Sequence, residues 1–116
     1  MHSASGGIAA HEAKLKKDPA GVKAVIRATL EAMDFNRREK SWMVNYIQNK
    51  WKVSAKVAED SYRLWLSGLT IDGKIPIKEL QEIYDQAYAS QLIPTPVPAA
   101  KVMDYTFTDE VFRERK

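Results

Sequence analysis

The chain has 116 residues, of which 45% are apolar and 28% charged, the composition of an ordinary globular protein with one domain at most. Its 18 basic and 15 acidic residues leave a net charge of +3, and this mixed balance argues against nucleic acid as a partner. With no cysteine, the chain forms no disulfide, no thiolate zinc site and no cysteine nucleophile. No apolar run reaches the length of a membrane span and residues 1–10 lack a signal-peptide pattern, so the sequence as given predicts no export signal.

The first patterned segment follows a run of small residues. Residues 1–7 predict a flexible start, with the pair Gly6-Gly7 acting as a break. Residues 8–17 then predict a short helix whose last turn carries lysines, where cations favour the helix dipole.

Residues 18–38 carry the longest helical pattern in the chain. Asp18 can accept hydrogen bonds from the N–H groups of a first turn, and Pro19 suits the first helical position. The apolar stripe of this helix consists of Val22, Val25, Ile26, Thr29, Leu30 and Met33. Because such a face is stable only when it is covered, we expect the rest of the chain to bury it.

Three further helices are predicted before the proline-rich segment. One begins near Ser41, and Ser54 is a suitable N-cap for the next, which Gly68 is expected to end in a left-handed conformation. Asp72-Gly73 predicts a turn, because the flanking arms are too short for a hairpin that buries much surface. Pro76 is expected in the first turn of the last helix, whose apolar stripe is Ile77, Leu80, Ile83, Tyr84, Ala87 and Tyr88.

The end of the chain has a different pattern. Prolines at positions 94, 96 and 98 forbid a helix and predict an extended strap across the domain surface, with an SH3-type ligand as the alternative. Thr106 and Asp109 resemble a capping box, which predicts a short closing helix. The expected organisation is therefore a flexible start over 1–7, a helical domain over 8–93, and a strap with a closing helix over 94–116.

No arrangement of residues indicates catalysis. The two histidines, His2 and His11, do not stand at metal-ligand spacing, and no glycine-rich loop is present to hold a phosphate group. The paired carboxylates fall on predicted helix surfaces. The sequence therefore predicts no enzyme activity, no metal site and no cofactor.

Aromatic residues gather in two adjacent predicted helices: Trp42, Tyr46, Trp51, Tyr62 and Trp65. At this density they are expected to be core or interface residues, and the alternative is that they line an apolar cleft. A small helical chain with so many large apolar groups is expected to bury some of them against another chain.

A series of short motifs runs through almost the whole chain. In order, these are Gly6-Gly7-Ile8-Ala9-Ala10-His11-Glu12, Leu15-Lys16-Lys17-Asp18-Pro19, Val25-Ile26-Arg27-Ala28-Thr29-Leu30-Glu31-Ala32, Trp51-Lys52-Val53, the turn with Asp72-Gly73, the helix with Leu80, Leu92-Ile93 and Asp104-Tyr105-Thr106-Phe107. Their order and spacing resemble the C-terminal third of periplasmic substrate-binding proteins of ABC importers. The subgroup is the nitrate/sulfonate/taurine type, with relatives similar to thiamine-pyrimidine synthases.

This resemblance implies a fold and a function. Family members are roughly three times longer and form two α/β lobes around a ligand cleft. The chain would be the part that returns to the first lobe, so it is expected to be mainly α, a bundle of about five helices that corresponds to the C-terminal part of a type II periplasmic-binding-protein fold without its sheet. Ser5, Gly6 and Gly7 would lie near the cleft edge as candidate ligand-binding residues.

The implied activity is solute capture for import, without chemistry. A small anion or a pyrimidine would bind only with the missing lobes, an ABC permease would be the partner, and the location would be periplasmic. Since helix faces shaped for a sheet would be left wet, we expect the helices to pack together and to pair with a second copy of the chain. The alternative function is a stand-alone helical module for protein–protein interaction.

Overall fold

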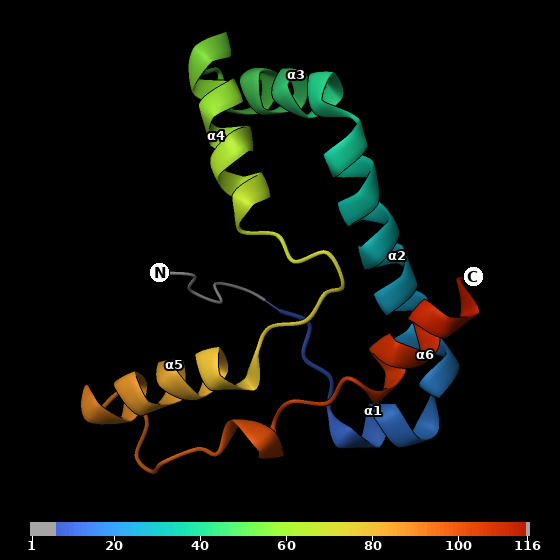
Figure 1. The fold of residues 1–116 in the computed structure, drawn as a ribbon, viewed down its shortest axis with the longest axis vertical. Helices are drawn as coiled ribbons and strands as arrows, with labels where there is room; N and C mark the ends of the chain where they lie inside the picture. Colours follow the sequence, from blue (N-terminus) through green and yellow to red (C-terminus); the bar gives the residue numbers. More distant parts are fainter. Residues whose placement is uncertain (1–6, 116) are drawn as a thin grey trace. The chain divides into compact units, whose positions relative to one another are not determined.

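The structure is a computed structural model, and it describes residues 7–115 (Figure 1). Within this range it contains six α-helices, one short 3-10 helix and no strand, which confirms the prediction of a mainly helical fold. The chain divides into two compact units. Arg27–Asp72 form the middle unit, and the described residues up to Ile26 together with those from Gly73 form the terminal unit. The expected division into residues 1–7, 8–93 and 94–116 stays a prediction.

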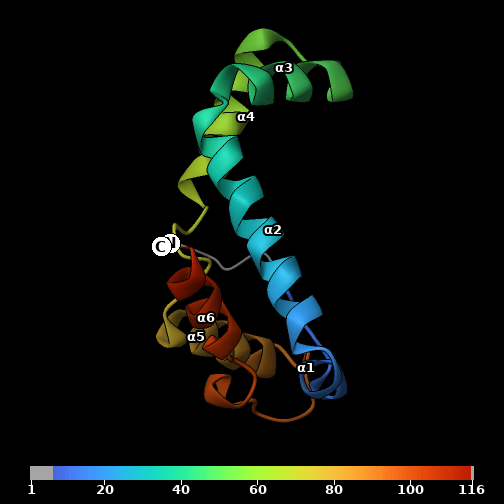
Figure 2. The same ribbon diagram turned by 90° about the vertical axis from the view of Figure 1, so that its right-hand side faces the viewer.

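The first two helices begin at side-chain caps. Helix α1, Glu12–Lys17, starts later than expected, because His11 is its N-cap and accepts the N–H of Ala13 on Nδ1 at 3.1 Å. Helix α2, Pro19–Arg38, begins where it was predicted, and the N–H of Gly21 donates to Oδ1 of Asp18 at 2.9 Å. Figure 2 shows α2 from the side as one uninterrupted helix.

The expected burial of the apolar stripe of α2 is only partly found. Leu30 is 3% exposed, but Val25 on the same stripe is 53% exposed. The prediction that the chain covers the whole stripe is therefore wrong. Helical periodicity identifies which residues share a face, but it does not supply an element to cover that face.

In the middle unit, helices α3, Lys40–Trp51, and α4, Ala55–Ser67, pack against each other. Lys52, with φ 53°, turns the chain between them, and Ser54 caps α4 as predicted, with Oγ accepting the N–H of Val57 at 3.2 Å. Tyr62 is 3% exposed, and its hydroxyl donates to the carbonyl oxygen of Asn36 at 2.8 Å near the end of α2. Ala58 is fully buried.

The predicted ends of two helices differ from the structure. Gly68 follows α4 with φ −90°, so the expected left-handed conformation is wrong there. The left-handed conformation occurs instead at Lys52 and Gln91, and at Gly73 in the predicted Asp72-Gly73 turn. Helix α5, Ile77–Ala89, begins one residue after Pro76, which is its N-cap and not its first residue.

The strap of residues 94–98 leads into the 3-10 helix η1, Ala99–Lys101, in the terminal unit. The side-chain amide of Gln81 on α5 holds it at two points, since Nε2 donates to the carbonyl oxygen of Val97 at 3.2 Å and Oε1 accepts the N–H of Ala99 at 2.8 Å. Ala99 is fully buried. The side chain of Gln81 therefore fixes the strap to α5 through backbone groups of Val97 and Ala99, and not through strap side chains.

The closing helix α6, Thr106–Glu114, is present as predicted, but the capping box is not. Its N-cap is Tyr105, and Oδ1 of Asp104 accepts the N–H of Thr106 at 2.9 Å. Val111 of this helix is fully buried. On its outer side, Nζ of Lys23 on α2 contacts two glutamates of α6, Glu114 at 2.7 Å and Glu110 at 3.4 Å.

Candidate functional site

The three residues that the resemblance placed near a ligand cleft do not form a site in the described structure. Ser5 and Gly6 lie outside the described residues. Gly7 is exposed, and apart from its own atoms and those of its two chain neighbours no heavy atom lies within 4 Å of the place where a side chain would begin. The role of these residues in ligand binding stays a prediction.

Among residues 7–115, no group of three or more histidine, cysteine, aspartate or glutamate side chains is placed to hold a metal ion. His11 acts as a helix cap. No helix in this part of the chain is both long and apolar enough to cross a membrane. An open depression on α6 is lined by Thr106, Asp109, Phe112 and Arg113.

The most distinctive surface is a row of aromatic side chains in the middle unit, which we call the aromatic row: Phe35, Trp42, Tyr46 and Trp51. Phe35 contacts Trp42 edge to face, with ring centroids 5.3 Å apart. Trp42 and Tyr46 stack with an angle of 6° between their planes and centroids also 5.3 Å apart. Tyr46 and Trp51 are again perpendicular, at 88° and 6.1 Å. Each ring therefore supports the next in a geometry that aromatic pairs prefer.

Helix geometry explains how the row forms. Trp42 and Tyr46 are four residues apart on α3 and so lie one above the other on the same face. Phe35 comes from the last turns of α2, and Trp51 is the final residue of α3. The row therefore joins two helices on either side of a tight corner at Glu39.

All four side chains of the row are exposed to solvent. Their exposed fractions range from 38% for Phe35 to 58% for Trp51. Of the five aromatic residues that the sequence singled out, only Tyr62 is a core residue as expected. The others leave apolar surface in water, which identifies this face as a candidate interaction surface.

A cation lies at one end of the aromatic row. Nζ of Lys50 is 5.6 Å from the centroid of the Tyr46 ring and 5.9 Å from that of Trp51. Ring faces carry partial negative charge, so the ammonium group is attracted to both. Lys50 also lies in the last turn of α3, where the helix dipole favours a positive charge.

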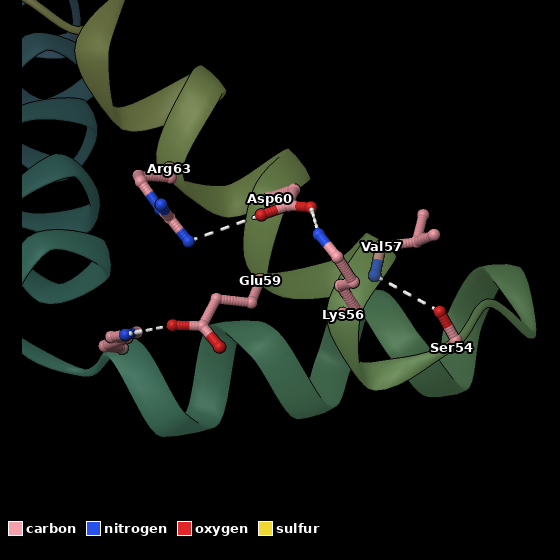
Figure 3. A network of polar contacts seen from close by, with 7 residues as sticks. Ser54, Lys56, Val57, Glu59, Asp60 and Arg63 are labelled. Carbon is pink, nitrogen blue, oxygen red and sulfur yellow. Dashed lines mark hydrogen bonds and ion pairs between the residues drawn. The ribbon is translucent and has the colours of Figure 1, made fainter.

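The polar face of α4 carries ion pairs, drawn in Figure 3. Lys56 contacts Asp60 at 2.7 Å, and Arg63 contacts the same carboxylate at 3.3 Å. The hydrogen bond from Lys56 lowers the pKa of Asp60. Lys40 on α3 contacts Glu59 at 2.6 Å and lowers the pKa of that carboxyl group in the same way. Lys40–Glu59 joins α3 and α4, whereas both pairs of Asp60 lie within α4. Because these side chains are largely exposed, each ion pair contributes little stability.

Part of the aromatic row could have been predicted from the spacing of residues along the sequence. Trp42, Tyr46 and Lys50 stand at every fourth residue, the spacing that aligns side chains along a helix. Phe35 could not be added to the row from sequence, because a helix boundary separates it from Trp42.

Fold and site together define an all-helical protein, over its described residues, with an exposed aromatic surface. Comparison with protein-family models, with curated proteins and with solved structures found no match to this chain.

Proposed function

We propose that the chain is a helical part of a substrate-binding protein of an ABC importer, of the nitrate/sulfonate/taurine type, and that it contributes to solute capture without chemistry. The choice of this family rests on the resemblance of the sequence motifs. The observation that carries the proposal is that well-formed helices have uncovered apolar faces. On α5, the stripe expected to rest on a sheet leaves Ile77 50% and Tyr88 46% exposed.

The free-energy cost of leaving apolar surface in water supports a partner that covers these faces. Apolar surface is stabilised by about 25 cal/mol for each Å² removed from water. If a sheet of an α/β lobe packed on α5 and on the α2 stripe that contains Val25, burial of this apolar surface would stabilise the assembly. In this proposal the permease and the periplasmic location follow from the importer, and the solute is a small anion or a pyrimidine.

The gene neighbourhood is the first test. The proposal expects a reading frame for two α/β lobes in continuity with this chain, beside genes for a permease and an ATPase. Calorimetric titration with nitrate, taurine and a hydroxymethylpyrimidine is the second. Heat should appear when the lobes are present and should be absent for the 116-residue chain alone. Tight binding of one of these solutes by the chain alone, or neighbours without a transporter, would overturn the proposal.

The second candidate is a stand-alone helical module for protein–protein interaction, and the aromatic row favours it. Exposed tryptophan and tyrosine side chains are the groups that dominate binding energy at protein interfaces. A second copy of the chain is the partner expected from its uncovered faces. Sedimentation over a range of concentrations tests this, since a compact monomer at high concentration would exclude self-association.

A further inference from the structure

The end of helix α3 forms a corner of two perpendicular aromatic rings, which we call the ring corner: Tyr46 and Trp51. The ring centroids are 6.1 Å apart and the planes meet at 88°. The ammonium group of Lys50 lies 5.6 Å from one centroid and 5.9 Å from the other, so cation and rings form a nearly equilateral triangle. The ring corner is thus already occupied by a cation from the chain itself.

Two features favour a positive charge at this place, and a third holds one of the rings. The faces of tyrosine and tryptophan rings attract cations. The C-terminal end of α3 adds the negative end of a helix dipole. Trp42 stacks on Tyr46 at an angle of 6° and helps to hold that ring in place.

Lys50 is a weak occupant of the ring corner. Its ammonium group is compact and strongly hydrated, and it sits on a flexible four-carbon stem. The two rings are 41% and 58% exposed, so a solute can approach them from water once the lysine side chain moves aside. A cation with a smaller hydration cost would therefore compete with it.

We propose that the ring corner binds a quaternary ammonium group and that Lys50 is its internal competitor. Methyl groups spread the charge of such a cation and reduce the cost of removing it from water, while they also make apolar contact with both rings. The group can belong to a free solute such as choline or to the headgroup of a phosphatidylcholine lipid. This site is independent of the proposed role in an importer, because it needs residues of the middle unit alone.

Nuclear magnetic resonance of the ¹⁵N-labelled full chain tests the proposal, because each of its three tryptophans contributes one indole N–H group as a probe. Choline chloride is titrated against sodium chloride at equal ionic strength. The indole signal of Trp51 should shift in a saturable manner, and that of Trp65 on α4, outside the aromatic row, should follow the sodium chloride control.

Two lysine variants separate competition from a general charge effect. Lys50→Met removes the internal competitor and should strengthen choline binding about two- to fivefold, the range expected for one exposed cation–π contact. Lys56→Met is the matched control, since Lys56 pairs with Asp60 on α4 and has the same charge and length, and it should leave binding unchanged. Tyr46→Ala, which removes one of the two rings of the ring corner, should abolish the choline-dependent shift of the Trp51 indole signal.

Phosphatidylcholine vesicles distinguish the two sources of the ligand. A Trp51 response to choline alone assigns the ring corner to a free solute, and a response to the vesicles as well assigns it to the lipid headgroup. The proposal is overturned if neither probe shifts Trp51 beyond the salt control, or if Lys50→Met and Lys56→Met change binding equally.

Discussion

The hydroxyl group of Tyr105 makes two hydrogen bonds to the backbone of Ile75. It accepts the N–H at 2.9 Å and donates to the carbonyl oxygen at 3.2 Å. These bonds connect the segment before α5 to the residue that precedes α6, thirty positions away in sequence. Lys74 lies 5.6 Å above the same ring and forms an ion pair with Asp109 on α6. One side chain thus connects two segments of the terminal unit that no strand pairing holds.

Tyr105→Phe should destabilise this connection, because it removes both hydrogen bonds and keeps the ring. The expected cost is about 1–2 kcal/mol, read as faster hydrogen exchange of the Ile75 amide. Tyr88→Phe on the exposed side of α5 is the matched control and should change little. Unchanged exchange at Ile75 in Tyr105→Phe would show that the two hydrogen bonds do not hold the segment.

Gln81→Ala should release the strap from α5. The change removes the donor to Val97 and the acceptor for Ala99, again at a cost of about 1–2 kcal/mol. The Ala99 amide should lose protection from hydrogen exchange, while helix α5 itself, monitored at Tyr84, should keep its protection. Gln86→Ala on the exposed face of the same helix is the control, and equal effects of the two variants would contradict the role of Gln81.

Ser54→Ala should weaken the start of α4 by about 1 kcal/mol, because the Val57 N–H loses its side-chain acceptor. Hydrogen exchange of the Val57 amide measures the effect. Ser61→Ala, in the interior of the same helix, should be neutral or slightly stabilising, since alanine is the better helix former. If both variants lowered the thermal midpoint by the same amount, the cap would not be the cause.

Acid should loosen the start of α2. The hydrogen bond from Lys14 and then that from the Gly21 N–H lower the pKa of Asp18 below its ordinary value of 3.8. A carboxyl group with a lowered folded-state pKa contributes stability that is present above pH 3.8 and is lost as the pH falls through the lowered pKa. The amide signal of Gly21 should therefore change in that acid range.

Asp18→Asn is the control for this pH dependence. The asparagine oxygen can still accept the Gly21 N–H, but it does not titrate, so the acid-dependent change at Gly21 should disappear. A Gly21 signal that titrates identically in both proteins would assign the change to another group.

Caps, turns and short helices could be predicted from the sequence where neighbouring residues along the chain determine the structure. The caps at Asp18 and Ser54, the turn at Asp72-Gly73 and the closing helix near Thr106 all depend on residues within one turn of each other. The conformations at two helix ends were predicted wrongly, namely the left-handed end expected at Gly68 and the capping box at Thr106.

The sequence by itself determined which segments are helical, because helix periodicity and capping are local properties of the chain. Only the tertiary structure decided which apolar faces are covered. Leu30 and Val25 share one stripe, yet one is buried and the other is half exposed, and the aromatic row crosses a helix boundary that periodicity cannot follow. Burial and ring contacts depend on residues that come together in space after the chain changes direction. The spacing of residues along the sequence does not specify such contacts.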